Sequence, residues 1–187
     1  MSKEFNILTD ALPDSVTLYG VEYPVHTSFK NWVKISSILE RENLKETKII
    51  AEVLKLCYKE ALPPNSMSAL LGAISFLNRG TDFSVSPQVK KERITSFCVD
   101  CDLIYSAFYS KYGIDLQKED LHWYKFCSLF ETLADENPFK TVIKIRTTDE
   151  NEIKNTKARS RISALKAKYR INSYKEVNVG ENIADLF

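Results

Sequence analysis

The sequence predicts a mainly α-helical protein with a β-hairpin near its N-terminus. Apolar residues between positions 29 and 169 mostly recur at spacings of three and four, which is typical of helices. One short segment before them alternates around a tight turn, as a hairpin does. The chain has 187 residues, 44% of them hydrophobic, which is enough to bury a sizeable core. We expect a bundle of six to seven helices behind one hairpin.

The hairpin is predicted by the first strong local pattern in the chain. Val16 and Leu18 fall on one face of a first strand, and Tyr19-Gly20 supplies a tight turn. Pro24 cannot donate a hydrogen bond to a sheet, so we expect it at the end of the second strand or on an edge. A lone hairpin is marginally stable in water, so it must pack on the rest of the protein or pair with a partner.

Six helices are predicted by apolar stripes in the order 29–39, 49–61, 66–77, 97–112, 121–133 and 138–143. Their boundaries are supported by residues that suit helix ends. Pro63 cannot continue a helix, and Gly80 and Gly113 fit C-terminal caps. Asn137 followed by Pro138 fits an N-cap with proline at the first helical position.

The charge is distributed unevenly along the chain, although the total is only +1. Residues 141–175 hold ten Lys or Arg and three acids, a net charge of +7, whereas residues 1–140 and 176–187 each carry −3. We therefore divide the chain into a hairpin segment (1–26), a helical core (27–147) with an exposed loop (81–96), a basic C-terminal helix (148–172) and an acidic tail (173–187). The sequence leaves the order of that tail open.

The basic helix, predicted from Lys154 to Tyr169, is the main electrostatic feature. It could contact nucleic acid or an acidic protein. Ile162 and Leu165 also provide a packing stripe, so the charges could simply be a solvated face. No alternation of aromatic and basic residues supports single-strand binding, so we favour a solvated or partner-facing helix over nucleic acid. The residues that would contact the partner are Arg159, Arg161, Lys166 and Lys168.

A zinc site is the one metal site that the sequence raises. Cys98 and Cys101 form a C-x-x-C pair, and His122 and Cys127 follow at a distance that could complete the ligand set. Against zinc, Cys101 and Cys127 fall on the apolar stripes, where free cysteine behaves as a small hydrophobic residue. We therefore expect reduced thiols, no bound metal and no cofactor.

Neither an enzyme nor a membrane protein is expected. The chain contains no phosphate-binding glycine motif, no zinc-protease motif and no hydrolase nucleophile motif. His122 could act as a general base, but it has no recognisable companion and is expected to have a structural role. No stretch approaches the roughly 18 apolar residues needed to span a membrane, and no signal peptide is evident, so the sequence predicts a cytoplasmic protein.

Several motifs occur in a characteristic order. They are Asn6-Ile-Leu-Thr-Asp-Ala-Leu-Pro-Asp-Ser-Val-Thr-Leu-Tyr-Gly-Val-Glu-Tyr-Pro-Val25, Thr27-Ser-Phe-Lys-Asn-Trp32, Asp102-Leu-Ile-Tyr-Ser-Ala-Phe-Tyr109, Tyr112-Gly-Ile-Asp-Leu116, Leu121-His-Trp-Tyr-Lys-Phe126 and Ile145-Arg-Thr147. Together they resemble the bacteriophage gene-product-fifteen family over roughly residues 5 to 170. The loop at 81–96 and the residues after Asn172 depart from the family pattern. In the last motif, Ile145 stands where the family has tyrosine.

The resemblance implies a role in phage tail morphogenesis and no enzymatic reaction, since genes of the family typically lie in the tail module of siphophages and prophages. Our leading hypothesis is an assembly chaperone in the host cytoplasm that binds the tape-measure protein, the tail-tube protein or both. The first alternative is a structural component of the tail, and the second is a nucleic-acid-binding protein that uses the basic helix. A homo-oligomer in which the basic helix contacts an acidic body also remains open.

Aromatic side chains are the candidate anchors for such a partner, because aromatic residues dominate interface energetics. The candidates are Trp32, Trp123 and Tyr124, together with Phe130. For any single one of them, a place in the protein's own core is favoured.

Overall fold

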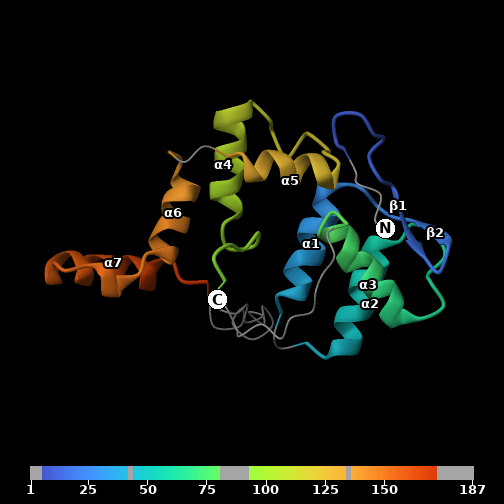
Figure 1. Ribbon diagram of the computed structural model, residues 1–187, viewed down its shortest axis with the longest axis horizontal. Helices are drawn as coiled ribbons and strands as arrows, with labels where there is room; N and C mark the ends of the chain where they lie inside the picture. The colour runs from blue at the N-terminus through green and yellow to red at the C-terminus, as the bar shows by residue number, and fades with distance from the viewer. Residues whose placement is uncertain (1–5, 42–43, 81–92, 134–135, 172–187) are drawn as a thin grey trace, which may run out of the picture.

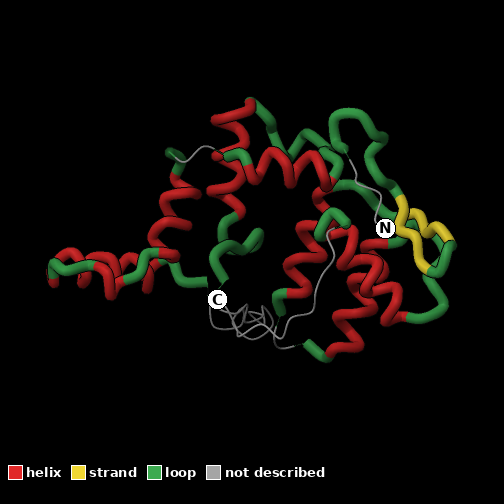
Figure 2. Tube along the Cα trace, in the orientation of Figure 1, coloured by secondary structure: helices red, strands yellow, loops and turns green. Residues whose placement is uncertain are grey.

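The computed structural model describes residues 6–41, 44–80, 93–133 and 136–171. These residues form one hairpin, seven α-helices and one short 3-10 helix (Figures 1 and 2): β1 (Ser15–Leu18), β2 (Val21–Pro24), α1 (Phe29–Leu39), α2 (Glu46–Cys57), α3 (Ser66–Leu77), α4 (Cys101–Tyr112), α5 (Trp123–Glu131), α6 (Pro138–Thr147), η1 (Glu150–Glu152) and α7 (Thr156–Lys168). The predicted mainly α fold with an N-terminal hairpin is confirmed.

The hairpin forms as its sequence predicts. Tyr19 and Gly20 have φ angles of +53° and +79°, so both central residues of the turn are left-handed, as a type I′ turn requires. Val16 pairs with Tyr23 across the sheet, and Pro24 is the last residue of β2. The side chain of Val16 is buried against the helices, which stabilises a sheet that would be marginal by itself.

The hairpin lies on α3, and α3 packs on α2, which packs on α1 (Figure 1). Gly72 allows the close approach between α3 and β1. A Cβ atom added to Gly72 would lie 2.8 Å from Tyr58 Oη and 3.1 Å from Leu18 Cδ1. The Tyr58 hydroxyl is fixed, because it donates a hydrogen bond to the carbonyl oxygen of Ala69 at 2.7 Å.

An aromatic core joins this half of the protein to α4 and α5. Trp32 from α1 is fully buried and stacks on Phe76 from α3, with ring centroids 4.6 Å apart. Phe126 from α5 stacks on Phe29 at 4.8 Å and on Phe108 from α4 at 5.0 Å. The ring of Phe126 therefore lies between helices from both halves.

The chain ends in a helix that projects from the body. α6 packs on α4, and α7 leaves α6 through η1 and extends sideways (Figure 1). No residue of α7 is buried. The basic segment predicted over 148–172 thus contains the short η1 and the 13-residue α7, which lies within the helix predicted from Lys154 to Tyr169. Asp149 caps η1 and Asn155 caps α7, so each starts its own helix.

Other helix boundaries also differ from those predicted. The helix expected over 49–61 ends at Cys57, and the helix expected over 138–143 continues to Thr147. The helix expected over 97–112 begins at Cys101, because the Asp100 side chain accepts a hydrogen bond from the Ser96 backbone N–H and holds the intervening residues in a turn. The helix expected from residue 49 begins at Glu46. Of the predicted loop at 81–96, residues 81–92 lie outside the described residues.

Candidate interaction surfaces

Two family motifs, Thr27–Trp32 and Leu121–Phe126, are joined by backbone hydrogen bonds. The Phe29 N–H donates to the carbonyl oxygen of Leu121 at 2.9 Å, and the Trp123 N–H donates to that of Thr27 at 2.7 Å. The indole N–H of Trp123 donates to the carbonyl oxygen of Leu77 at 2.9 Å. Segments far apart in the sequence are thus fixed to one another, and α1, α3 and α5 meet around them.

His122 is a structural residue in this arrangement. Its Nδ1 accepts a hydrogen bond from the Tyr124 N–H at 3.1 Å, which caps α5. Its Nε2 lies 2.8 Å from the carbonyl oxygen of Pro13. A carbonyl can only accept, so Nε2 carries the hydrogen and the ring is neutral. Burial lowers the pKa of His122, which favours the same neutral form.

The candidate zinc ligands considered in the sequence do not form a site. Cys98 is exposed in the turn before α4, and Cys101 is the exposed first residue of that helix. Cys127 lies on α5, where burial raises its pKa to about 12. Both ring nitrogens of His122 already have hydrogen-bond partners. In the described part of the chain, no three His, Cys, Asp or Glu residues gather where they could hold a metal ion.

The predicted aromatic anchors are core residues. Trp32, Trp123 and Tyr124 are 0%, 3% and 5% exposed, and Phe130 is half-buried against the same core. Their large rings fill the space between the helices of both halves, so they are not presented to a partner in this structure. An apolar docking surface must be sought elsewhere.

An exposed apolar surface lies on α3, beside the turn of the hairpin. We call it the α3 face and define it by Tyr19, Met67 and Leu71, which are 85%, 50% and 54% exposed. The Tyr19 hydroxyl lies 2.8 Å from Ser68 Oγ, which places the hairpin turn against the start of α3. The twelve residues of α3 include no charged side chain. The sequence did not predict this face, because the apolar residues of α3 are typical of a helix that is buried in the core.

Two hollows flank the α3 face. One, of about 620 Å³, lies between α2 and the start of α3 and includes Ile50, Leu54 and Leu62 in its lining. The other, of about 300 Å³, lies between β1 and α3, with Leu18 and Leu71 in its lining. Apolar side chains of a partner could enter either hollow while its backbone follows α3.

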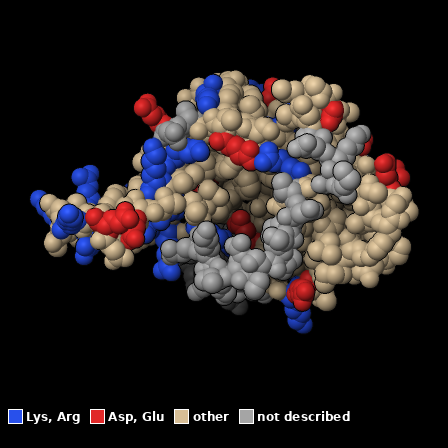
Figure 3. Space-filling model, viewed as in Figure 1, with Lys and Arg blue, Asp and Glu red and all other residues tan. Residues whose placement is uncertain are grey.

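The predicted basic contacts lie on α7, which we call the basic arm. Arg159, Arg161 and Lys168 are exposed, and Lys and Arg side chains surround the arm in Figure 3. Lys166 is half-buried, because its Nζ donates to the carbonyl oxygen of Thr148 at 3.0 Å and lies 3.7 Å from a carboxylate oxygen of Glu150. Three of the four predicted residues are therefore exposed. The guanidinium of Arg159 also donates to the carbonyl oxygen of Ile153 at 2.9 and 3.2 Å, and Lys166 holds the arm to the segment before it.

Sequence reasoning missed a buried ion pair between Asp100 and Arg146. The two side chains are 2% and 7% exposed, and the guanidinium donates to both carboxylate oxygens at 2.7 Å. Arg146 also donates to the carbonyl oxygens of Ile94 and Tyr169, at 2.9 and 2.7 Å. The residue had been counted as part of a basic stretch. The one available signal was its place in the Ile145-Arg-Thr147 motif.

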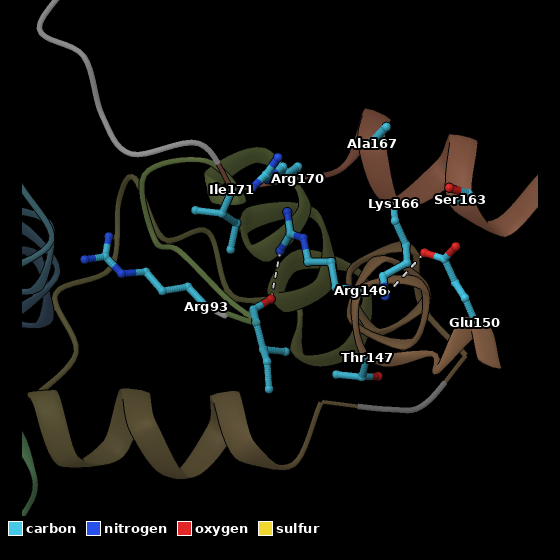
Figure 4. A pocket seen from close by; sticks show the side chains of 10 residues that line it. Arg93, Arg146, Thr147, Glu150, Ser163, Lys166, Ala167, Arg170 and Ile171 are labelled. Carbon is cyan, nitrogen blue, oxygen red and sulfur yellow. Dashed lines mark hydrogen bonds and ion pairs between the residues drawn. The ribbon is translucent and has the colours of Figure 1, made fainter. Parts of the chain in front are cut away.

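A hollow of about 720 Å³ lies beside this pair, between residues 93–94, α6 and the basic arm (Figure 4). We call it the basic hollow. Its charged lining residues are Arg93, Arg146, Glu150, Lys166 and Arg170, so cations outnumber acids there. Ile94, Ala167 and Ile171 supply apolar wall.

A family model described as bacteriophage Gp15 protein matches residues 8–171 of the chain. The chain belongs to this family. The resemblance inferred from the motifs is confirmed, and membership in the Gp15 family indicates a structural or morphogenesis role in a phage. Neither a curated protein nor a solved structure matches the chain. No helix in the described ranges is long and apolar enough to cross a membrane.

The motifs of this Gp15-family protein mostly build its interior. Gly113 has a φ of +67° and ends α4 with a left-handed cap. Asp115 then accepts hydrogen bonds from the Tyr105 hydroxyl and the Gln117 N–H, both at 3.1 Å, which fixes the turn that leads to the buried Leu116. The motif residues therefore maintain the fold, and the exposed surfaces lie mostly between them.

Proposed function

We propose that this Gp15-family protein is a tail-assembly chaperone, which binds the tape-measure protein or the tail-tube protein in the host cytoplasm before the tail tube polymerises. The α3 face is the observation that carries the proposal. It combines exposed apolar side chains with an uncharged helix, on a protein of a phage family. Exposed apolar patches of this kind mark interaction sites on soluble proteins.

The α3 face suits an amphipathic helix as its partner. Met67 and Leu71 are four residues apart, so they lie on one side of α3 about one helical turn from each other. A partner helix that lies along them would set its own apolar residues against this row and into the flanking hollows. Binding of this type shields the apolar face of an unassembled protein from water.

The basic arm supports the same proposal as a second contact. Arg159, Arg161 and Lys168 are exposed along a helix that projects from the body. Exposed cations accelerate encounter with an acidic surface, and their attraction is weakened by salt. A contact of this kind is easily reversed, which a chaperone requires when the tube assembles.

Co-expression with the tape-measure or tail-tube protein from the same phage tests the proposal. The expected result is that the partner becomes more soluble and co-purifies with this protein. Replacing Met67→Ser and Leu71→Ser together should abolish both effects, because the apolar row is lost. The matched control is Val99→Ser with Tyr109→Ser, since these residues are 50% and 57% exposed on another part of the surface. Failure of the wild-type protein to solubilise or retain either partner would overturn the proposal.

A structural role in the mature tail is the second candidate, and the hairpin favours it. In the described residues the sheet has only two strands, so each strand has an edge without a sheet neighbour. Such an edge can receive a strand from another subunit. Mass spectrometry of purified particles separates the two functions, because a tail component is present at fixed stoichiometry and a chaperone is absent or present in traces.

A further inference from the structure

We propose that residues 172–187 of this chain dock in the basic hollow as an intramolecular acidic ligand. The inference does not depend on the proposed function. It rests on the chemistry of the hollow, on the place where the described chain reaches it, and on the composition of the residues that follow.

The cations of the basic hollow are only partly paired with carboxylates of the described residues. Arg146 is fully engaged by Asp100. Lys166 and Arg93 each donate a hydrogen bond to a backbone carbonyl, of Thr148 and of Glu40, both at 3.0 Å. Their carboxylate partners, Glu150 and Glu40, lie 3.7 and 3.9 Å away, which is longer than a hydrogen-bonded ion pair. Arg170 is exposed at the hollow and has no ion pair within the described ranges.

The chain itself leads to the hollow. Ile171, the last described residue, lines it together with Arg170. Residue 172 therefore starts at the wall of the hollow. A fully extended chain spans about 3.3 Å per residue, so Glu176 lies within roughly 17 Å of Ile171 along the chain. A segment tethered so closely has an effective concentration on the order of millimolar.

The composition of residues 172–187 complements the hollow. Residues 172–187 hold three acids and one lysine, a net charge of −2, and the three acids fall in the last twelve residues, where apolar residues are interspersed in the sequence Glu-Val-Asn-Val-Gly-Glu-Asn-Ile-Ala-Asp-Leu-Phe. The acids match the cations of the hollow. The apolar side chains match the wall formed by Ile94, Ala167 and Ile171. A free partner with an acidic segment would have to displace this one before it could bind there.

Photo-cross-linking of the full chain tests the proposal. p-Benzoyl-phenylalanine is introduced at Val179 in one variant and at Phe187 in another, and cross-linked peptides are mapped by mass spectrometry. The expected result, from at least one position, is cross-links within the same chain to residues 93–94, α6 or α7. Their yield should fall several-fold at 1 M salt, because screening weakens ion pairs at the surface.

Charge reversal supplies the specificity control. Arg170→Glu should reduce the yield several-fold, whereas Arg161→Glu should leave it unchanged, because Arg161 is exposed on the arm but does not line the hollow. Circular dichroism checks that both variants keep their helices. The proposal is overturned if both positions cross-link elsewhere or not at all, or if Arg161→Glu acts as strongly as Arg170→Glu. Cross-links between ¹⁴N- and ¹⁵N-labelled copies would assign the hollow to the tail of a second copy and would likewise overturn it.

Discussion

Arg146 connects more of the structure than any residue of the predicted site. Its guanidinium binds the Asp100 carboxylate and two backbone carbonyls, one before α4 and one at the end of α7. These four hydrogen bonds use four of the five N–H donors of the guanidinium, whereas a lysine ammonium has only three donors and cannot bind a carboxylate through a planar fork. One buried side chain thus ties the end of the basic arm to the body, in addition to the contacts of the arm with α6 and η1.

Replacing Arg146→Met should lower the free energy of unfolding by about 3–5 kcal/mol, because it leaves the Asp100 carboxylate buried without its cation. Denaturant unfolding followed by circular dichroism measures the loss. Arg161→Met is the matched control, since Arg161 is exposed, and it should change stability by less than about 0.5 kcal/mol. Equal effects of the two substitutions would contradict a structural role for the buried pair.

His122 should make stability depend on pH. Burial lowers its pKa in the folded protein, so the folded state holds the ring neutral. Below the pKa of the unfolded chain, about 6.5, the unfolded state binds a proton that the folded state does not. The stabilisation by the neutral, buried His122 ring is therefore fully present above about pH 6.5. The free energy of unfolding falls as the pH is lowered below that value.

Denaturant unfolding between pH 5 and 8 measures this dependence. His122→Asn removes the titrating ring, while asparagine can still cap a helix. The variant should show a shallower decline on the acidic side than the wild type. If both proteins lose stability equally between pH 6.5 and 5, His122 is not the group responsible.

The groups to which His122 and Asp100 bind could not be predicted from the sequence. A structural role for His122 follows from its lack of catalytic companions, but its acceptor is Pro13, 109 positions away. The same holds for Asp100, which pairs with a residue 46 positions further on. Hydrophobic periodicity reports which face of a helix is buried and says nothing about which distant polar group meets another.

Among the elements, the contact between α3 and β1 is the one most sensitive to side-chain size. A Cβ at Gly72 would lie 2.8 Å from the hydroxyl oxygen of Tyr58, which is held by its own hydrogen bond. Helix propensity alone would make alanine the better residue here, by about 1 kcal/mol. Packing should reverse that preference.

We expect Gly72→Ala to destabilise the protein by about 1–3 kcal/mol, because the hairpin must move away from α3. Thermal and denaturant unfolding measure the change. Ser75→Ala on the same helix is exposed and should be neutral or slightly stabilising. A gain in stability for Gly72→Ala would show that the hairpin accommodates the methyl group at no cost.

The elements themselves were largely predictable, and the late start of α4 has a tertiary cause. The turn at Tyr19-Gly20, the stop before Gly113 and the Asn137-Pro138 start all follow from the residues at those positions. The late start of α4 depends on Asp100, whose carboxylate is fixed by Arg146 from another helix. A tertiary contact of this kind overrides a local pattern.

Over the whole molecule, the two candidate surfaces lie far apart. The hairpin and α3 stand at one end of the long axis, and the basic arm projects at the other (Figure 1). The arm could be predicted from charge, because exposed cations need no partner within the chain. The α3 face could not be predicted, because an uncharged apolar helix is expected to be buried. The aromatic residues considered as candidate anchors fill the core.

Two separate surfaces of different chemistry predict two separable contributions to partner binding. With a tape-measure or tail-tube protein as the partner, Met67→Ser with Leu71→Ser should weaken binding equally at low and high salt. Arg161→Gln with Lys168→Gln should weaken binding at low salt and have little effect at high salt, because screening by salt already removes the attraction of these exposed cations. Isothermal titration at two salt concentrations measures both. Equal salt sensitivity of the two variants would show that the surfaces do not act separately.

The backbone bonds between Thr27–Phe29 and Leu121–Trp123 also set an order of events on the ribosome. The first four helices of a nascent chain leave the exit tunnel before Trp123 and Phe126 do, so Trp32 and Phe76 lack part of their surroundings until then. Phe126 is synthesised 50 residues after Phe76. At about 5–20 residues per second, the interval between the two residues is on the order of several seconds. This protein, proposed to shield apolar segments of other proteins, would thus expose its own apolar residues during synthesis. General chaperones of the host would be the first proteins to bind those residues.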